Sequence, residues 1–214
     1  MAIILDGTTG VSAPAIVSLT TPLTAPNGGT SITSPGSSTN VLTSDGTTWY
    51  SGAAGGGGGG GITRATAQNV TGVGYVDFTG IPSTAKRISV LMYNCQATSG
   101  RIYINVGTSG GMISTGYNSA TMICDASGNV YNDASTTALV VSADVVYGYN
   151  DYNGIFTLDN IDGYKWSFAG TGSTYTYFPI VCGGRVDATA AITTIRVALS
   201  TGNFTSGTVN IFYE

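Results

Sequence analysis

Histidine is absent from this 214-residue chain, and cysteine occurs only three times, at Cys95, Cys124 and Cys182. Without histidine, the chain lacks the commonest base of enzyme active sites and the commonest zinc ligand. The cysteines are odd in number, lie far apart and lack the spacing of metal ligands, so they predict neither a disulfide framework nor a metal site. We interpret all three as small hydrophobic residues of a core, and we expect no cofactor.

Charged residues are scarce as well. They make up 8% of the chain, whereas an ordinary soluble domain has about 25%. A net charge of −4 without a basic cluster argues against nucleic-acid binding. No apolar run approaches the roughly 18 residues that span a membrane, so we expect no membrane insertion. The first six residues lack the basic stretch of a signal peptide, which favours synthesis in a cytosol and release outside the secretory route.

Lysine and arginine are missing altogether from residues 1–61, which end in seven consecutive glycines at positions 55–61. A glycine run is typical of a flexible tether between two ordered parts. Close packing of three chains around an axis is the alternative, because only glycine lets backbones approach so closely. The sequence therefore predicts an N-terminal segment (1–52), a glycine-rich hinge (53–61) and a C-terminal domain (62–214).

The N-terminal segment has too little apolar surface to form a core alone, and four prolines restrict it to short extended pieces. An Asp-Gly pair at Asp45 lies between an apolar stretch and Trp49, which predicts a small β-hairpin there. We expect Ile3, Leu5 and Trp49 to be buried by docking to a partner or among three copies of the chain, since they would otherwise be exposed.

After the hinge the pattern becomes consistently β. Short apolar or alternating runs are separated by turn-forming Ser-Gly, Asn-Gly and Asp-Gly pairs, and we find no sustained helical period. A single helical turn is expected at residues 81–87. The fold predicted is an all-β, antiparallel, jelly-roll-like β-sandwich, with strands at residues 73–78, 88–93, 102–106, 138–143, 155–158, 175–181, 195–199 and 209–213.

Several of these stretches resemble parts of bacteriophage tail fibre proteins. The C-terminal domains of that family are similar to this chain in their entry, central aromatic strand and ending, at YVDFTGIP (75–82), AKRISV (85–90), YKWSFAG (164–170) and SGTVNIFYE (206–214). A module that is common in phage fibres resembles GGTSI (28–32) and NVLTSDGTTW (40–49). One departure is Thr84, where the family usually has tryptophan, and the long repetitive shaft of many fibres is absent.

This resemblance implies a homotrimeric virion protein of a phage tail, made in the host cytoplasm. Its N-terminus would dock to a tail or baseplate protein, and its C-terminal domain would bind a host-surface receptor, expected to be a polysaccharide. The alternative is a structural or decoration protein of the capsid or tail without a host-binding role. We do not expect an enzyme, because Ser-His-Asp chemistry is excluded and no pair of carboxylates can be assigned to glycoside hydrolysis.

Tyrosines beside amide and carboxylate groups provide the candidate receptor-binding residues. Tyrosine rings cover the apolar faces of sugars, while Asn and Asp bind the hydroxyl groups. The candidates are Tyr149, Asn150, Asp151 and Tyr152, with Tyr175 and Tyr177 as a second group. For both groups the alternative is an ordinary hairpin turn or strand edge. Residues 125–133 loosely resemble a calcium loop, but the glycine and glutamate positions do not match, which favours a polar turn.

Overall fold

The computed structural model describes residues 40–44, 49–53, 61–143, 151–174 and 178–214. The chain divides into two compact units between Gly60 and Gly61. In the first unit, β1 (Asn40–Ser44) pairs with β2 (Trp49–Ala53) in antiparallel register, with Ser44 opposite Trp49. The predicted hairpin is therefore confirmed. Ile3, Leu5 and the glycines from Gly55 to Gly60 lie outside the described residues. Burial of Ile3, Leu5 and Trp49 therefore stays a prediction.

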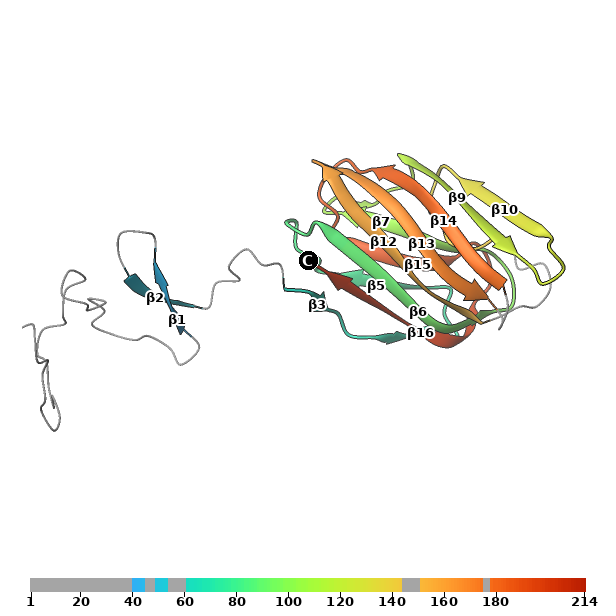
Figure 1. The fold of residues 1–214 in the computed structure, drawn as a ribbon, viewed down its shortest axis with the longest axis horizontal. Coiled ribbons are helices and arrows are strands. Elements are labelled where there is room, and N and C mark those ends of the chain that lie inside the picture. Colours follow the sequence, from blue (N-terminus) through green and yellow to red (C-terminus); the bar gives the residue numbers. More distant parts are fainter. Residues whose placement is uncertain (1–39, 45–48, 54–60, 144–150, 175–177) are drawn as a thin grey trace, which may run out of the picture. The chain divides into compact units, whose positions relative to one another are not determined.

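The second unit consists of two antiparallel sheets, one in front of the other in Figure 1. The predicted all-β sandwich is confirmed, and the described residues contain no helix. The larger sheet has the order β10-β9-β14-β13-β12-β6-β16-β3, and β4 also pairs with β16. Its strands are β3 (Thr63–Arg64), β4 (Gln68–Asn69), β6 (Arg87–Ala97), β9 (Tyr117–Cys124), β10 (Val130–Ser135), β12 (Tyr152–Asp162), β13 (Lys165–Thr174), β14 (Phe178–Asp187) and β16 (Phe204–Tyr213).

The smaller sheet has the order β11-β7-β15-β5, with β8 paired to β7. Its strands are β5 (Tyr75–Thr79), β7 (Ile102–Thr108), β8 (Gly111–Met112), β11 (Leu139–Val140) and β15 (Thr194–Leu199). Alternate residues of both sheets point into one shared hydrophobic core. Its largest fully buried side chains include Phe156, Phe168, Ile104 and Ile195.

Two of the three cysteines belong to that core. Cys95 and Cys182 are buried, and burial raises the pKa of the Cys95 thiol to about 11 and that of Cys182 to about 12. Both thiols therefore stay protonated and act as small hydrophobic groups, as predicted. Cys124 corrects the prediction, because it ends β9 on the outer side of the larger sheet and is only partly buried.

β9, β10 and one turn differ from the sequence prediction, because no strand is predicted at 117–124 or 130–135. β10 alternates between exposed and half-buried residues and contains Asn132 and Asp133, so its apolar pattern is too weak to identify it. The turn predicted as helical is a single β-turn, in which the Ala85 amide donates to the Pro82 carbonyl at 3.0 Å. The next two amides, of Lys86 and Arg87, both donate to the carbonyl of Glu214 instead of continuing a helix.

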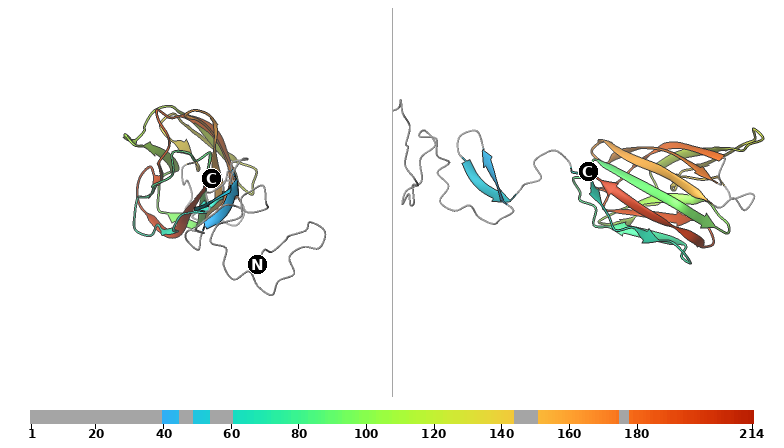
Figure 2. Two further views of the ribbon diagram at one scale, coloured as in Figure 1. Left: turned by 90° about the vertical axis from the view of Figure 1, so that its left-hand side faces the viewer. Right: turned by 60° about the horizontal axis from the view of Figure 1, so that its bottom comes forward.

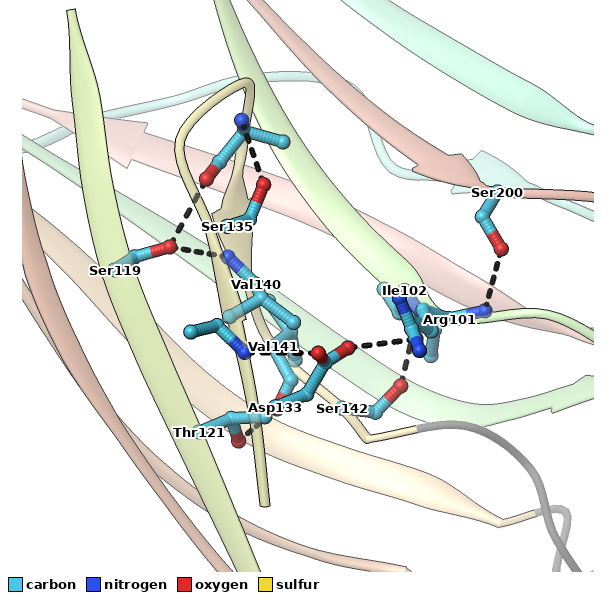
Figure 3. A network of polar contacts seen from close by, with 12 residues as sticks. Arg101, Ile102, Ser119, Thr121, Asp133, Ser135, Val140, Val141, Ser142 and Ser200 are labelled. Carbon is cyan, nitrogen blue, oxygen red and sulfur yellow. Dashed lines mark hydrogen bonds and ion pairs between the residues drawn. The ribbon is translucent and has the colours of Figure 1, made fainter.

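The predicted strand at 138–143 forms only a two-residue ladder, because side chains satisfy part of its backbone (Figure 3). The Ser119 hydroxyl accepts from the Val140 amide and donates to the Ala138 carbonyl, both at 2.9 Å. The Thr121 hydroxyl donates to the Val141 carbonyl at 2.8 Å. Because Ser119 and Thr121 belong to β9, these bonds fasten the smaller sheet to the larger one along this side of the sandwich.

The domain has an entry end and a free end. β3, where the chain enters the domain, pairs with the end of β16, placing Thr63 opposite Tyr213. The right-hand view of Figure 2 shows this segment beside the C-terminus. At the other end of the same sheet, Phe204 lies opposite Ala97 and Tyr152 opposite Cys95. We call these the entry end and the free end.

Gly170 tests the packing of the core. A Cβ atom at this position would overlap the ring of Phe156 and would lie 3.0 Å from the Cys182 sulfur. We expect Gly170→Ala to lower the free energy of unfolding by about 1–3 kcal/mol, measured by urea denaturation. Gly183→Ala is the control, because its Cβ would lie 3.6 Å from the nearest described heavy atom, the Phe168 carbonyl oxygen. Equal stability of the two variants would contradict this packing.

Ser119 tests the fastening between the sheets. The side chain is 3% exposed, so Ser119→Ala would leave the Val140 amide and the Ala138 carbonyl buried without this partner. We expect a loss of about 1–3 kcal/mol in the free energy of unfolding, measured by thermal or urea denaturation. Ser167→Ala, on an exposed position of β13, should change it by less than about 0.5 kcal/mol. An unchanged free energy of unfolding in Ser119→Ala would show that these hydrogen bonds do not stabilise the domain.

Candidate receptor-binding surface

The outer face of the smaller sheet brings together two tyrosines and an ion pair from three neighbouring strands. Strand alternation turns Tyr75 and Asp77 of β5 outward, because Val76 and Phe78 are buried in the core. The register places Ala198 of β15 opposite both Tyr75 and Tyr103, and Arg196 opposite both Asp77 and Asn105. Two rows of side chains therefore cross the three strands on one face.

Arg196 and Asp77 form a bidentate ion pair. Arg196 Nε and Nη2 donate to the two carboxylate oxygens of Asp77, each at 2.7 Å. The hydrogen bond to Asp77, together with its charge, raises the pKa of Arg196, so the guanidinium stays charged. The guanidinium carbon also lies 4.0 Å from the centroid of the Tyr75 ring, a cation–π distance. These contacts fix Arg196 against Tyr75 without a ligand.

The two tyrosines lie on either side of a small residue. Tyr75 is 52% exposed, Tyr103 is half-buried, and Ala198 between them rises little above the sheet. Two strand spacings, about 9.6 Å, separate the backbones of the tyrosines. We call Tyr75, Tyr103, Ala198, Asp77 and Arg196 the tyrosine platform.

A cleft adjoins the platform at the β5 edge. It has a volume of about 320 Å³ and is lined by Asp77 and by residues of the chain around β4, among them Thr66 and Gln68. The Gln68 side-chain amide donates to the Asp77 carbonyl at 2.7 Å. This bond occupies one of the backbone groups at the β5 edge, so the Gln68 side chain links the wall of the cleft to the platform strand.

Of the six predicted receptor-binding residues, one is buried in the structure, and four lie outside the described residues. Tyr152 is 3% exposed and belongs to the core, because it lies opposite buried Cys95 at the start of β12. Its ring therefore does not face a receptor. Tyr149, Asn150, Tyr175 and Tyr177 lie outside the described residues.

Asp151, the remaining predicted site residue, takes part in a polar cluster at the free end. Its carboxylate accepts from the Gln96 side-chain amide at 2.7 Å, and its carbonyl accepts from the Asn153 side chain at 3.0 Å. The Asn153 side chain in turn accepts from the amide of Asn94, whose φ of 49° is in the left-handed region. The cluster holds the bulged pairing of β6 and β12, so its polar groups bond mainly to one another.

The calcium-like stretch is a polar turn between β9 and β10. One carboxylate oxygen of Asp125 accepts from the amides of Ser127 and Asn129, both at 2.8 Å. The other accepts from the Asn129 side chain at 2.7 Å and the Tyr131 hydroxyl at 3.2 Å. These bonds, first of all the one from the Asn129 side chain, lower the pKa of Asp125. Among the described residues, no group of three or more His, Cys, Asp or Glu side chains could hold a metal ion.

Sequence reasoning missed the tyrosine platform, although a signal for it exists. The alternation of residues 102–106 and 195–199 already assigns Tyr103 and Arg196 to the faces opposite the core. The pairing of these two strands with β5, which aligns Tyr75 with Tyr103, is a long-range feature that no local pattern contains.

Comparison with known proteins adds no identification. The chain matches no protein-family model and no curated protein. The described part of the chain has no helix long and apolar enough to cross a membrane.

Arg196 tests the rigidity of the platform. Lysine keeps the positive charge but cannot form a two-pronged bond with Asp77. We expect Arg196→Lys to lower the free energy of unfolding by about 1 kcal/mol, measured by urea denaturation. The control is Arg185→Lys, because Arg185 is 61% exposed and makes a single 2.7 Å contact with Asp187. A change no larger than that of the control would contradict the anchoring role of Arg196.

Proposed function

We propose that this protein is a non-enzymatic phage tail fibre protein that binds a host-surface glycan through residues 62–214. In this proposal the protein is a homotrimer of the virion, made in the host cytoplasm, and residues 1–52 dock it to a tail or baseplate protein. The observation that carries the receptor-binding role is the tyrosine platform. The resemblance of its terminal stretches to phage fibre domains supports the virion role.

The platform suits a sugar because it combines ring surface with fixed polar groups. Tyrosine provides a large contact area with little loss of side-chain entropy, and its hydroxyl group can bond to sugar hydroxyls. Tyr75 and Tyr103 lie far enough apart to contact different residues of one glycan chain. The Arg196–Asp77 pair presents charged donors and acceptors that are already oriented, which reduces the entropy lost on binding.

The position of the platform in the domain supports presentation to a host. Within the smaller sheet, Thr79 and Thr194 pair towards the entry end, whereas Tyr75 and Ala198 pair at the opposite end of the same strands. The Gly74 carbonyl accepts from the Leu199 amide there, at 2.9 Å. A chain tethered through Gly61 therefore carries the platform on the part of the sheet that lies farther from the tether.

Four carboxylates of the described domain are engaged in ion pairs, which supports a binding role over hydrolysis. Asp77, Asp133, Asp159 and Asp187 each form an ion pair with an arginine, at 2.6–2.7 Å. A glycosidase needs one carboxyl group that is protonated and a second that is available as nucleophile or base. Carboxylates whose oxygens already bond to arginine are less available for the second of these roles.

Glycan binding by the full-length protein tests the proposal. We expect wild-type protein to bind at least one member of an array of bacterial surface polysaccharides. Tyr75→Ala and Tyr103→Ala should each weaken that binding about tenfold or more, because stacking contributes on the order of 1 kcal/mol per ring and the polar contacts of the ring are lost with it.

Tyr164→Ala is the matched control, because Tyr164 is 50% exposed but lies in the turn between β12 and β13 at the entry end. Its binding should equal that of wild type. Binding that is unaffected by the two platform substitutions would contradict the assignment of the site. If wild-type protein binds no polysaccharide on the array, a structural or decoration role in the capsid or tail is favoured instead.

A further inference from the structure

The outer face of the larger sheet carries a row of exposed aliphatic side chains. Ile155, Val181 and Met122 are 47%, 50% and 42% exposed, and they belong to β12, β14 and β9. The register joins them into one line through Thr171, since Ile155 pairs with Thr171, Thr171 with Val181, and Val181 with Met122. We call these four residues the aliphatic row. Exposed apolar groups that adjoin one another mark an interaction surface.

The neighbouring row towards the entry end consists of small residues. Thr157 pairs with Ala169, Ala169 with Gly183, and Gly183 with Ala120. At the other side of Thr157, the Ser89 hydroxyl lies 3.2 Å from the Thr157 hydroxyl. Because the small row is lower than the aliphatic row, the face is hollowed there, with a volume of about 580 Å³.

The next row beyond the small one carries charged side chains, and these form ion pairs with one another and with neighbouring charged residues. Arg87 lies between two carboxylates, 2.6 Å from Asp159 and 3.0 Å from Glu214. Arg185 bonds to Asp187 at 2.7 Å. These charged groups already pair with one another, so they are not available to a highly charged ligand. The face therefore favours a partner that is mainly apolar and whose own charged groups at the edge are paired.

We propose that this face packs against another copy of the same chain, with the strands of the two copies running in the same direction. This inference rests on the proposed function, in which all copies dock by their N-termini and therefore have their entry ends together. The rows cross the strands, so in such a parallel assembly each row of one copy lies level with the same row of the next. Aliphatic side chains then bury one another at one level, and the hollows over the small residues face each other at the adjacent level.

The size of the face fits a stable contact. From β16 to β10 the larger sheet has seven strands, which at about 4.8 Å spacing span about 29 Å. A fourth row lies beyond the aliphatic row towards the free end, where Asn153 pairs with Ser173 and Ser173 with Pro179. The four rows, at about 6.8 Å for every second residue, add about 20 Å along the strands. The flat area of the face is therefore roughly 600 Å² per copy, without the extra surface of protruding side chains. This area approaches the 800 Å² per partner that a standard interface buries.

The same arrangement leaves the tyrosine platform free. The platform lies on the outer face of the smaller sheet, whereas the aliphatic row lies on the outer face of the larger sheet, with the core between them. An assembly that buries the larger sheet therefore keeps the smaller sheets facing outwards. Several copies would then present several platforms, which increases avidity for a repetitive glycan.

Thiol labelling of the full-length protein tests which face is buried. Thr171 and Thr79 are both exposed strand residues of the single chain, the first on the aliphatic row and the second on the smaller sheet. In a Cys124→Ser background, we expect Thr171→Cys to react with a maleimide at least tenfold more slowly than Thr79→Cys. Adding Val181→Asp should raise the Thr171→Cys rate to that of Thr79→Cys, because a charge disrupts the apolar contact.

Light scattering on the same samples separates the possible failures. Equal labelling rates in a multimeric protein would overturn this interface while leaving the homotrimer of the proposed function intact. Slow labelling that Val181→Asp does not change would also overturn it, since the aliphatic row would not be the contact. A monomer at every concentration would overturn both the interface and the homotrimer, whereas the polysaccharide array would still decide receptor binding.

Discussion

Burial of one face of every long strand in a single core fixes the position of the remaining side chains of the domain. In β6, β12, β13 and β14, alternate residues are buried between the sheets, and a shift by one residue would bring the core residues to the surface. The residues that point away from the core must therefore line up across neighbouring strands. Both the tyrosine platform and the aliphatic row are rows of this kind, so the core determines the two candidate functional surfaces.

Local patterns in the sequence predicted many elements of this core, but they missed β9 and did not predict how the strands are arranged. The alternation in residues 102–106 and 195–199 predicted β7 and β15, and the Asp-Gly signal at Asp45 predicted the N-terminal hairpin. β10 was missed because each of its two faces mixes apolar and polar residues. The stretch at 138–143 was overpredicted because Ser119 and Thr121, about 20 residues earlier, satisfy its backbone. Such side-chain bonds depend on tertiary contacts, which have no periodic signal.

The candidate binding site was even harder to predict from local sequence patterns. A search for tyrosines beside Asn and Asp selected Tyr152, which is buried, because the large ring of tyrosine packs in cores as well as in interfaces. The platform instead joins Tyr75, Tyr103 and Arg196, which are far apart in the sequence and become neighbours through strand pairing. The two outer faces then differ in chemistry. One presents rings with an oriented ion pair, and the other presents aliphatic groups with neutralised charges, which fits receptor binding on one side and assembly on the other.

The most direct test is an electron cryomicroscopy map of the full-length protein in the presence of a bacterial surface polysaccharide that it binds. We predict that the larger sheets face one another within the assembly, that the smaller sheets face solvent, and that sugar density covers Tyr75 and Tyr103. Sugar density on another surface, or smaller sheets buried between copies, would contradict the proposed division of the domain into a binding face and an assembly face.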